Sequence, residues 1–245
     1  MGQMFSETDV ARWKTGSQMM LDVLDLKVAK YRPGGRLPRQ FSRQYLEQAL
    51  IAIAEREGGK FIGFVRASVE CDLLLWKNQI NGLCEPETAE TIKQMGISPI
   101  ISALLINREF GIEAARWFLS VKGIFDNGVY SLGEFLSRLI NGERGADIDL
   151  PQGTDEDLAA ISKAIYQRDE TELRDSIVTG AENWNRMILQ DRGHSNCVGY
   201  LLGMAFIRLA RELWLPRFKV DHFLIPLEIL DFKEGEIVPL PFPDA

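Results

Sequence analysis

The sequence is poor in the residues that most often perform catalysis or bind metals. It contains 2 histidines and 3 cysteines in 245 residues, and Cys71, Cys84 and Cys197 lack the spacing of a zinc site or a disulfide framework. A phosphate loop, a dinucleotide-binding fingerprint, H-E-x-x-H and G-x-S-x-G are also absent from it. We therefore expect reduced thiols, no metal, no cofactor and no enzymatic activity.

Long apolar runs are absent too. The longest candidates, such as residues 100–106, fall well short of the roughly 20 residues that cross a bilayer. The first thirteen residues lack the basic start and apolar core of a secretory signal. With 46% hydrophobic and 26% charged residues, the composition is that of a folded globular protein. These features predict a cytoplasmic protein that does not bind membranes.

Helical periodicity runs through most of the chain and predicts an all-α fold, a multi-helix array of antiparallel helix pairs. We expect Ser6, Ser98 and Thr154 to cap helices, and Ser131 with Glu134 to form a capping box. Glycines are expected to end or interrupt helices at Gly58-Gly59, Gly111 and Gly142. The expected helices cover residues 7–29, 42–57, 61–80, 86–95, 98–106, 112–121, 131–140, 154–167, 170–188 and 195–213.

The predicted organisation is a single all-helical domain, 1–245. Residues 142–153 are the best linker candidate and would join possible sub-halves 1–141 and 154–245. The last thirty residues carry five prolines, which forbid a long helix. We expect them to form an extended proline-rich tail across the helices, with room for one short strand or hairpin.

The net charge of the chain resides in one segment. Residues 147–182 carry ten acids and three bases, a net charge of −7 that equals the net charge of the whole chain. A localised acidic field repels nucleic acid and anionic membranes and attracts basic protein surfaces. Carboxylates at helix starts are also ordinary helix chemistry, because they favour the positive end of the helix dipole. The candidate binding residues are Asp155, Glu156, Asp157, Asp169, Glu170 and Glu172.

Three further features have weaker functional interpretations. His194 and Cys197 are three residues apart, a spacing that allows a nucleophile and base but more often serves structure. Asp221 adjoins His222 and is expected to raise its pKa. A basic run at Lys30, Arg32, Arg36, Arg39 and Arg43 contains no acid. In an acidic protein this run favours contact with the acidic half of the chain over binding to nucleic acid.

The C-terminal hundred residues resemble the bacterial immunity protein 49 family. The resemblance lies in the Arg-Asp-Glu turn within residues 165–173, Trp184, the His194-Ser195 loop, Gly199-Tyr200 and the ending at residues 221–230. The helical immunity proteins of related DNase toxins end in a similar way.

The resemblance implies a cytoplasmic antidote, encoded beside a toxin used in interbacterial competition, that binds the toxin domain, blocks or distorts its active site and does no chemistry. A nuclease toxin is basic because it holds phosphates, so an acidic helical edge would complement it. Two other functions stay open on the sequence alone. One is a non-enzymatic helical scaffold or adaptor, and the other is a small hydrolase that uses Cys197 and His194.

Overall fold

The protein is all-α. The computed structural model describes residues 6–121, 123–146, 149–188 and 199–242, and these residues form eleven helices and no strand. The helices are α1 Glu7–Val28, α2 Leu37–Ala54, α3 Gly58–Ile80, α4 Pro86–Met95, α5 Ser98–Leu104, α6 Arg108–Ser120, α7 Asn127–Ile140, α8 Glu156–Gln167, α9 Glu170–Ile188, α10 Leu201–Leu213 and α11 Leu227–Leu230. The predicted fold class is therefore confirmed.

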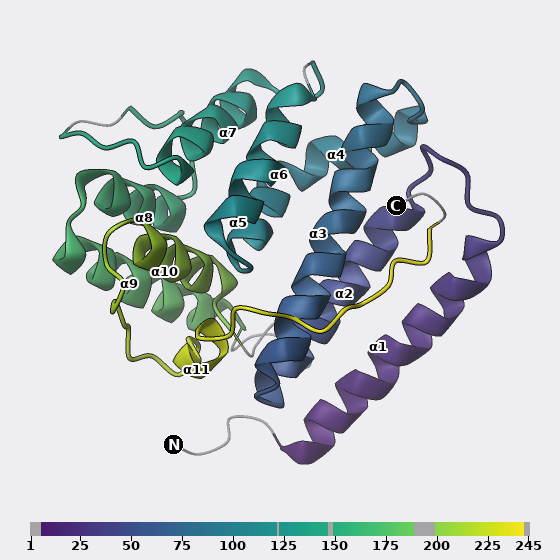
Figure 1. Ribbon diagram of the computed structural model, residues 1–245, viewed down its shortest axis with the longest axis horizontal. Coiled ribbons are helices and arrows are strands. Elements are labelled where there is room, and N and C mark those ends of the chain that lie inside the picture. The colour runs from purple at the N-terminus through teal and green to yellow at the C-terminus, as the bar shows by residue number, and fades with distance from the viewer. Residues whose placement is uncertain (1–5, 122, 147–148, 189–198, 243–245) are drawn as a thin grey trace.

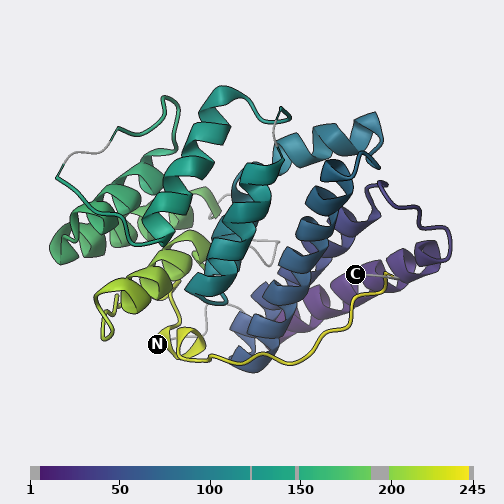
Figure 2. The same cartoon turned by 45° about the horizontal axis from the view of Figure 1, so that its top comes forward.

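The helices are arranged in chain order from one end of the molecule to the other (Figure 1). The helix α1 lies along one edge beside α2, and α2 packs along α3. The short helices α4 and α5 lead to α6 and α7, and α8, α9 and α10 occupy the end opposite α1. The tail after α11 returns across α3 toward the α1 end, and the turned view shows the same course (Figure 2).

The main hydrophobic core spans both halves of the chain, and a second, smaller cluster that includes Leu24, Phe41 and Phe242 lies between α1, α2, α3 and the tail. One cluster of buried side chains extends from Trp13 on α1 to Leu230 on α11, and it includes residues on both sides of the candidate linker at 142–153. Trp76 lies fully buried within it and meets Phe118 edge-on, with ring centroids 5.8 Å apart. The other tryptophans expected in the core, Trp117, Trp184 and Trp214, are half-buried at its margin.

Several helix starts differ from the prediction by one or a few residues. Asp155, and not Thr154, caps α8, and Thr154 instead donates a hydrogen bond to the carbonyl of Pro151. The predicted capping box at Ser131 was wrong because α7 begins earlier, at Asn127, where Asp126 caps it. Ser98 lies inside α5 and makes no capping bond. At α8 two adjacent polar residues could cap the helix, whereas α7 begins a full turn earlier than expected and α5 has the apolar Ile97 at its N-cap position.

Two glycine sites predicted to break helices lie inside helices. Gly58 begins α3, and the break between α2 and α3 falls at Arg56, which adopts a left-handed φ of 60°. Gly111 lies in α6, which begins at Arg108 after the cap Asn107. A Cβ at position 111 would lie 2.4 Å from the side chain of Leu104, so this glycine allows α5 and α6 to approach closely.

The tail is joined to α3 by backbone contact. The amide of Glu236 donates a hydrogen bond to the carbonyl of Gly59 over 3.0 Å. Further along, the ring of Phe242 packs on Tyr31 and Phe41 at centroid distances of 4.8 and 5.4 Å. The short helix α11 interrupts the tail, and its described residues contain no strand.

Replacing Gly63 with valine is expected to lift the tail from α3. A Cβ at position 63 would lie 2.4 Å from the carbonyl oxygen of Glu236, and backbone cannot yield as a flexible side chain can. Overpacking of this kind costs about 1–3 kcal/mol. Urea denaturation and the rate of proteolysis in the tail measure the effect. Gly59→Ala is the control, because its nearest neighbour would be 3.9 Å away; equal behaviour of the two variants would contradict the docking of the tail.

Candidate functional site

The candidate acidic site lies on the helix pair α8 and α9 at one end of the molecule (Figure 1). The side-chain amide of Asn183, near the end of α9, donates a hydrogen bond to Asp157, at the start of α8, over 2.9 Å. The two helices therefore run in opposite directions, and their N-termini lie at opposite ends of the pair. A twelve-residue α-helix such as α8 is about 18 Å long.

This geometry divides the six candidate acids into two groups. The first, which we call the α8-start cluster, consists of Asp155, Glu156 and Asp157. The second, which we call the turn cluster, consists of Asp169, Glu170 and Glu172 at the start of α9. The sequence led us to expect all six acids near one edge, but the structure places the clusters at opposite ends of α8.

In each cluster one acid also caps the N-terminus of its helix. Asp155 accepts a hydrogen bond from the amide of Leu158 over 3.1 Å, and Asp169 accepts one from the amide of Glu172 over 3.0 Å. Such capping satisfies an otherwise unpaired helix amide, and the helix dipole favours the negative charge there. Part of the acidity is thus explained by structure, while Glu156 and Glu172 are exposed and make no capping bond.

The turn cluster is partly neutralised. Glu170 forms an ion pair with Arg174 over 3.0 Å, the only one within the described part of residues 149–182. Arg174 also lies over the ring of Phe218 and donates to the carbonyl of Lys219, which brings the tail close to this cluster. Arg168 adjoins the cluster and lies over the ring of Trp214. Two arginines, Arg174 and Arg168, therefore adjoin the turn cluster.

The α8-start cluster keeps more of its negative charge. Among the described residues none of its three carboxylates forms an ion pair. Arg186 is linked to the cluster only indirectly, because it donates a hydrogen bond to Asn183, which in turn donates one to Asp157. The negative charge of the cluster also affects Tyr200, which lies at the N-cap of α10. Burial raises the pKa of Tyr200, and Asp157 and Asp155 raise it further. Carboxylates of this kind accept hydrogen bonds only, so they suit lysine and arginine side chains of a partner.

Replacing Asp155 with asparagine separates its two roles. Asparagine caps helices as well as aspartate does, so Asp155→Asn should leave the free energy of unfolding nearly unchanged, whereas Asp155→Ala should cost about 1 kcal/mol. Urea denaturation of the two variants checks this. A loss of the same size in both would mean that Asp155 stabilises α8 by its charge and not by its hydrogen bond to Leu158.

The basic run lies far from the acids. Lys30 to Arg43 span the junction of α1 and α2, at the opposite end of the molecule from α8 and α9 (Figure 1). Arg39 is bound instead to Asp72 on α3, over 2.9 Å. The predicted contact between the basic run and the acidic half is therefore wrong.

The environment of His222 does not indicate a catalytic site. His194 and Cys197 lie outside the described residues. His222 accepts a hydrogen bond from the amide of Leu224 over 3.2 Å. Burial lowers its pKa, although Glu182 and Asp221 oppose the shift. The expected rise in the pKa of His222 was wrong, because desolvation outweighs the neighbouring carboxylates.

The other cysteines are free thiols with raised pKa values. Cys71 is fully buried, and burial raises its pKa well above its usual range. Burial also raises the pKa of the half-buried Cys84 to about 11. A nucleophilic or metal-binding cysteine needs the thiolate, so neither environment favours that chemistry.

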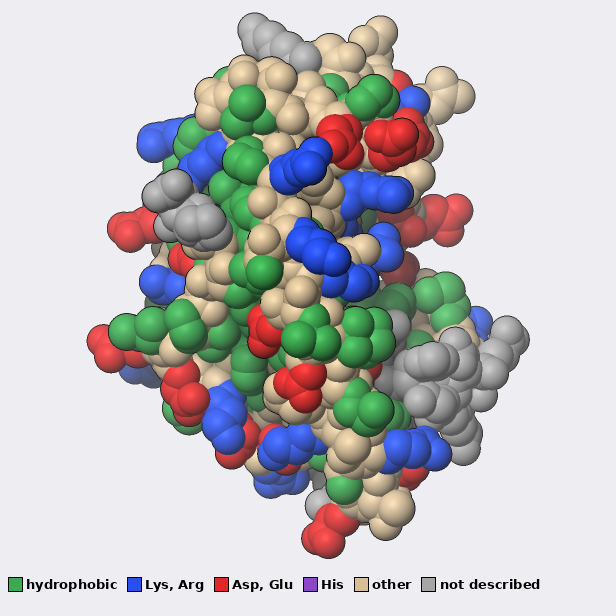
Figure 3. Space-filling view, turned by 90° about the vertical axis from the view of Figure 1, so that its right-hand side faces the viewer, with side chains coloured by type: hydrophobic (Ala, Val, Ile, Leu, Met, Phe, Trp, Pro, Cys, Tyr) green, Lys and Arg blue, Asp and Glu red, His purple; other side chains and the backbone are tan. Residues whose placement is uncertain are grey.

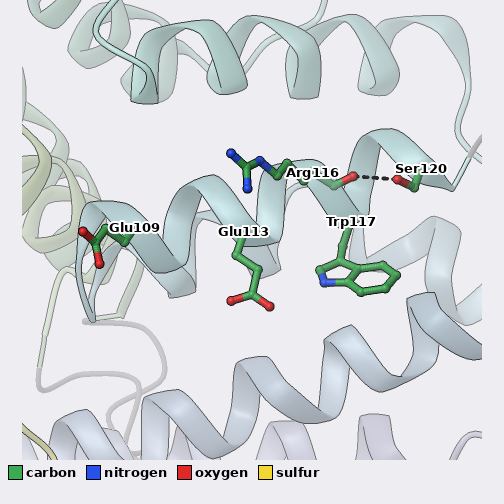
Figure 4. A pocket seen from close by; sticks show the side chains of 5 residues that line it. All are labelled: Glu109, Glu113, Arg116, Trp117 and Ser120. Carbon is green, nitrogen blue, oxygen red and sulfur yellow. Dashed lines mark hydrogen bonds between the residues drawn. The ribbon is translucent and has the colours of Figure 1, made fainter.

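A shallow hollow in the described surface lies along α6 (Figure 4). It is lined by Glu109, Glu113, Arg116, Trp117 and Ser120, all from that one helix. Glu113 and Trp117 point to one side while Arg116 points to the other, so the charged groups do not converge (Figure 4). Lys77 of α3 already lies over the ring of Trp117. This hollow does not form a catalytic constellation.

Comparison of the chain with protein-family models, curated proteins and solved structures found no match. Within residues 6–242, leaving aside the gaps given above, no three histidine, cysteine or acidic side chains gather in the manner of a metal site. No helix of the described residues has the length and apolar character needed to cross a membrane. The α8-start cluster and the turn cluster are thus the candidate site.

Proposed function

We propose that the chain is an immunity protein that binds a cognate antibacterial toxin and neutralises it. The observation that carries this proposal is the localisation of charge: the net charge of −7 equals that of residues 147–182, whose described acids, apart from Asp149, lie on one helix pair or at the starts of its helices. A surface of this kind complements a basic protein, and a nuclease effector must be basic to hold phosphates. The protein acts in the cytoplasm by binding alone, with no cofactor and no chemistry of its own.

The α8-start cluster is the centre of the proposed toxin-binding surface. Its carboxylates lack ion pairs with described residues, so a cationic partner need not displace an existing arginine. The turn cluster contributes less, because Arg174 and Arg168 adjoin it. Both clusters are mostly exposed, as a binding surface requires.

Co-expression with the toxin domain encoded by the neighbouring gene tests the proposal. Bacteria that produce the toxin domain should stop growing, and the wild-type protein should restore growth. A double variant, Asp155→Asn with Glu156→Gln, should protect less, because it removes two charges while keeping the cap. A matched variant on α4, Glu87→Gln with Glu90→Gln, should protect fully. Failure of the wild-type protein to protect against its neighbour would remove the immunity function.

A further inference from the structure

The helix α1 contributes little to the core of its own chain. Of its 22 residues only Trp13, Ser17 and Leu24 are buried, whereas α2 buries ten of eighteen. Most helices in proteins draw their stability from packing an apolar face against the rest of the molecule. The helix α1 therefore leaves an unusually large part of its surface without a packing partner among the described residues.

That outward face is apolar. Of the ten large hydrophobic side chains that are exposed among the described residues, four lie on α1: Met19, Met20, Val23 and Leu26. Leu26 is 79% exposed. The spacing of three and four residues places these side chains on one face of the helix. Green side chains are visible beside basic ones on the side of the molecule that carries α1 (Figure 3).

A glycine interrupts the same face. A Cβ at Gly16 would have nothing within 4 Å, so packing within the chain does not require glycine there. Glycine in the middle of a helix lowers its stability. On this face, however, it leaves a gap one turn before Met20, into which a long side chain from another helix can fit.

Charges of opposite sign mark the two ends of the face. Asp9 lies on this face in the first turn of α1, and Lys27 lies on it in the last turn. Two copies of α1 packed antiparallel would place the acidic end of each beside the basic end of the other. Arg12 lies near the acidic end, but it is already paired with Asp9 of its own chain over 3.3 Å.

We propose that α1 is the interface of a symmetric dimer in which the α1 helices of two copies of this chain pack antiparallel. A two-fold axis crosses α1 at the level of Gln18, so that Met20 of each copy enters the gap at Gly16 of the other and Asp9 lies opposite Lys27. A helix of 22 residues is about 33 Å long, so the contact lies at the small end of specific interfaces. The Kd of the dimer is therefore expected to be micromolar.

Light scattering coupled to size-exclusion chromatography, at loading concentrations from about 1 to about 100 µM, brackets that Kd. The wild-type chain should change from monomer to dimer across this range. Val23→Glu should remain a monomer throughout, with an unchanged circular dichroism spectrum because the side chain is exposed. Ile237→Glu is the control, since Ile237 is 95% exposed outside α1, and it should dimerise like the wild type. Lys27→Glu should weaken the dimer about tenfold at low salt.

Two results would overturn the dimer. One is a wild-type chain that stays monomeric at the highest concentration. The other is a dimer that Val23→Glu leaves intact, which would move the interface elsewhere. Loss of toxin binding in Val23→Glu, with a monomeric wild type, would assign the face to the partner and also overturn the proposal. None of these results affects the acidic surface on α8 and α9.

Discussion

Replacing Asp72 with alanine is expected to lower the free energy of unfolding by about 3–5 kcal/mol. Asp72 is 3% exposed on α3 and accepts two hydrogen bonds from Arg39 on α2, over 3.0 and 2.9 Å. Arg39 also donates to Ser42, which lies 3.1 Å from Ser68. Burial raises the pKa of Asp72 and Arg39 opposes the rise, so each charge depends on the other. Alanine would leave the guanidinium buried without its anion.

A double variant provides the control for this prediction. Replacing both partners with apolar residues, Asp72→Leu with Arg39→Met, removes both buried charges and should recover most of the loss. Urea denaturation of the single and double variants gives the comparison. A loss below about 1 kcal/mol in Asp72→Ala would place the pair in the range of exposed ion pairs and contradict its burial.

Replacing Arg208 with methionine is expected to cost about 3 kcal/mol or more, because buried carbonyl groups lose a charged donor. Arg208 lies on α10, is 6% exposed, and donates to the carbonyls of Ile106, Leu230 and Phe232. Its burial lowers its pKa to about 10. The guanidinium thus connects the α5–α6 loop to the beginning of the tail.

Arg211 on the same helix is the matched control. It donates to Asp231, which is largely exposed, and to the carbonyl of Phe218. Arg211→Met should cost less than Arg208→Met and should not speed proteolysis of the tail after residue 232. Equal losses in the two variants would show that the three carbonyl contacts of Arg208 stabilise the fold no more than the contacts of Arg211, whose acidic partner is exposed.

Most of the helices could be predicted from the sequence because their signals are local. Ser6 caps α1 as expected, with a capping box to Asp9, and Pro86 begins α4. The periodic stripe on α9 places Leu173 and Ile177 in the core. The predicted helix breaks at Gly58-Gly59 and Gly111 were wrong, because the conformation and packing at these positions depend on the rest of the fold. Arg56 takes the left-handed turn that a glycine was expected to take, and Gly111 serves the packing of α5 against α6.

The candidate site could be predicted only in part. The excess of acids is visible in the sequence, and the helices that carry them were expected. The sequence analysis did not take into account that a short turn makes α8 and α9 antiparallel. Their N-termini, and the acids that lie there, are therefore at opposite ends of the helix pair. The ion pair between Arg174 and Glu170 is a local pair four residues apart, but the tail residues Phe218 and Lys219 lie beside Arg174 through contacts 44 and 45 residues apart in the chain. No local pattern encodes such contacts.

The rate of association with the neighbouring toxin domain tests the acidic binding surface most directly. It should be measured at ionic strengths of about 0.01 and about 1 M, where the Debye length is about 30 and about 3 Å. The wild-type protein should bind at least about tenfold faster at low salt. Asp155→Asn with Glu156→Gln should lose most of this difference, and Asp169→Asn with Glu172→Gln should lose less. Absence of binding, or rates that neither salt nor these substitutions change, would contradict the proposal that the α8-start cluster binds the toxin.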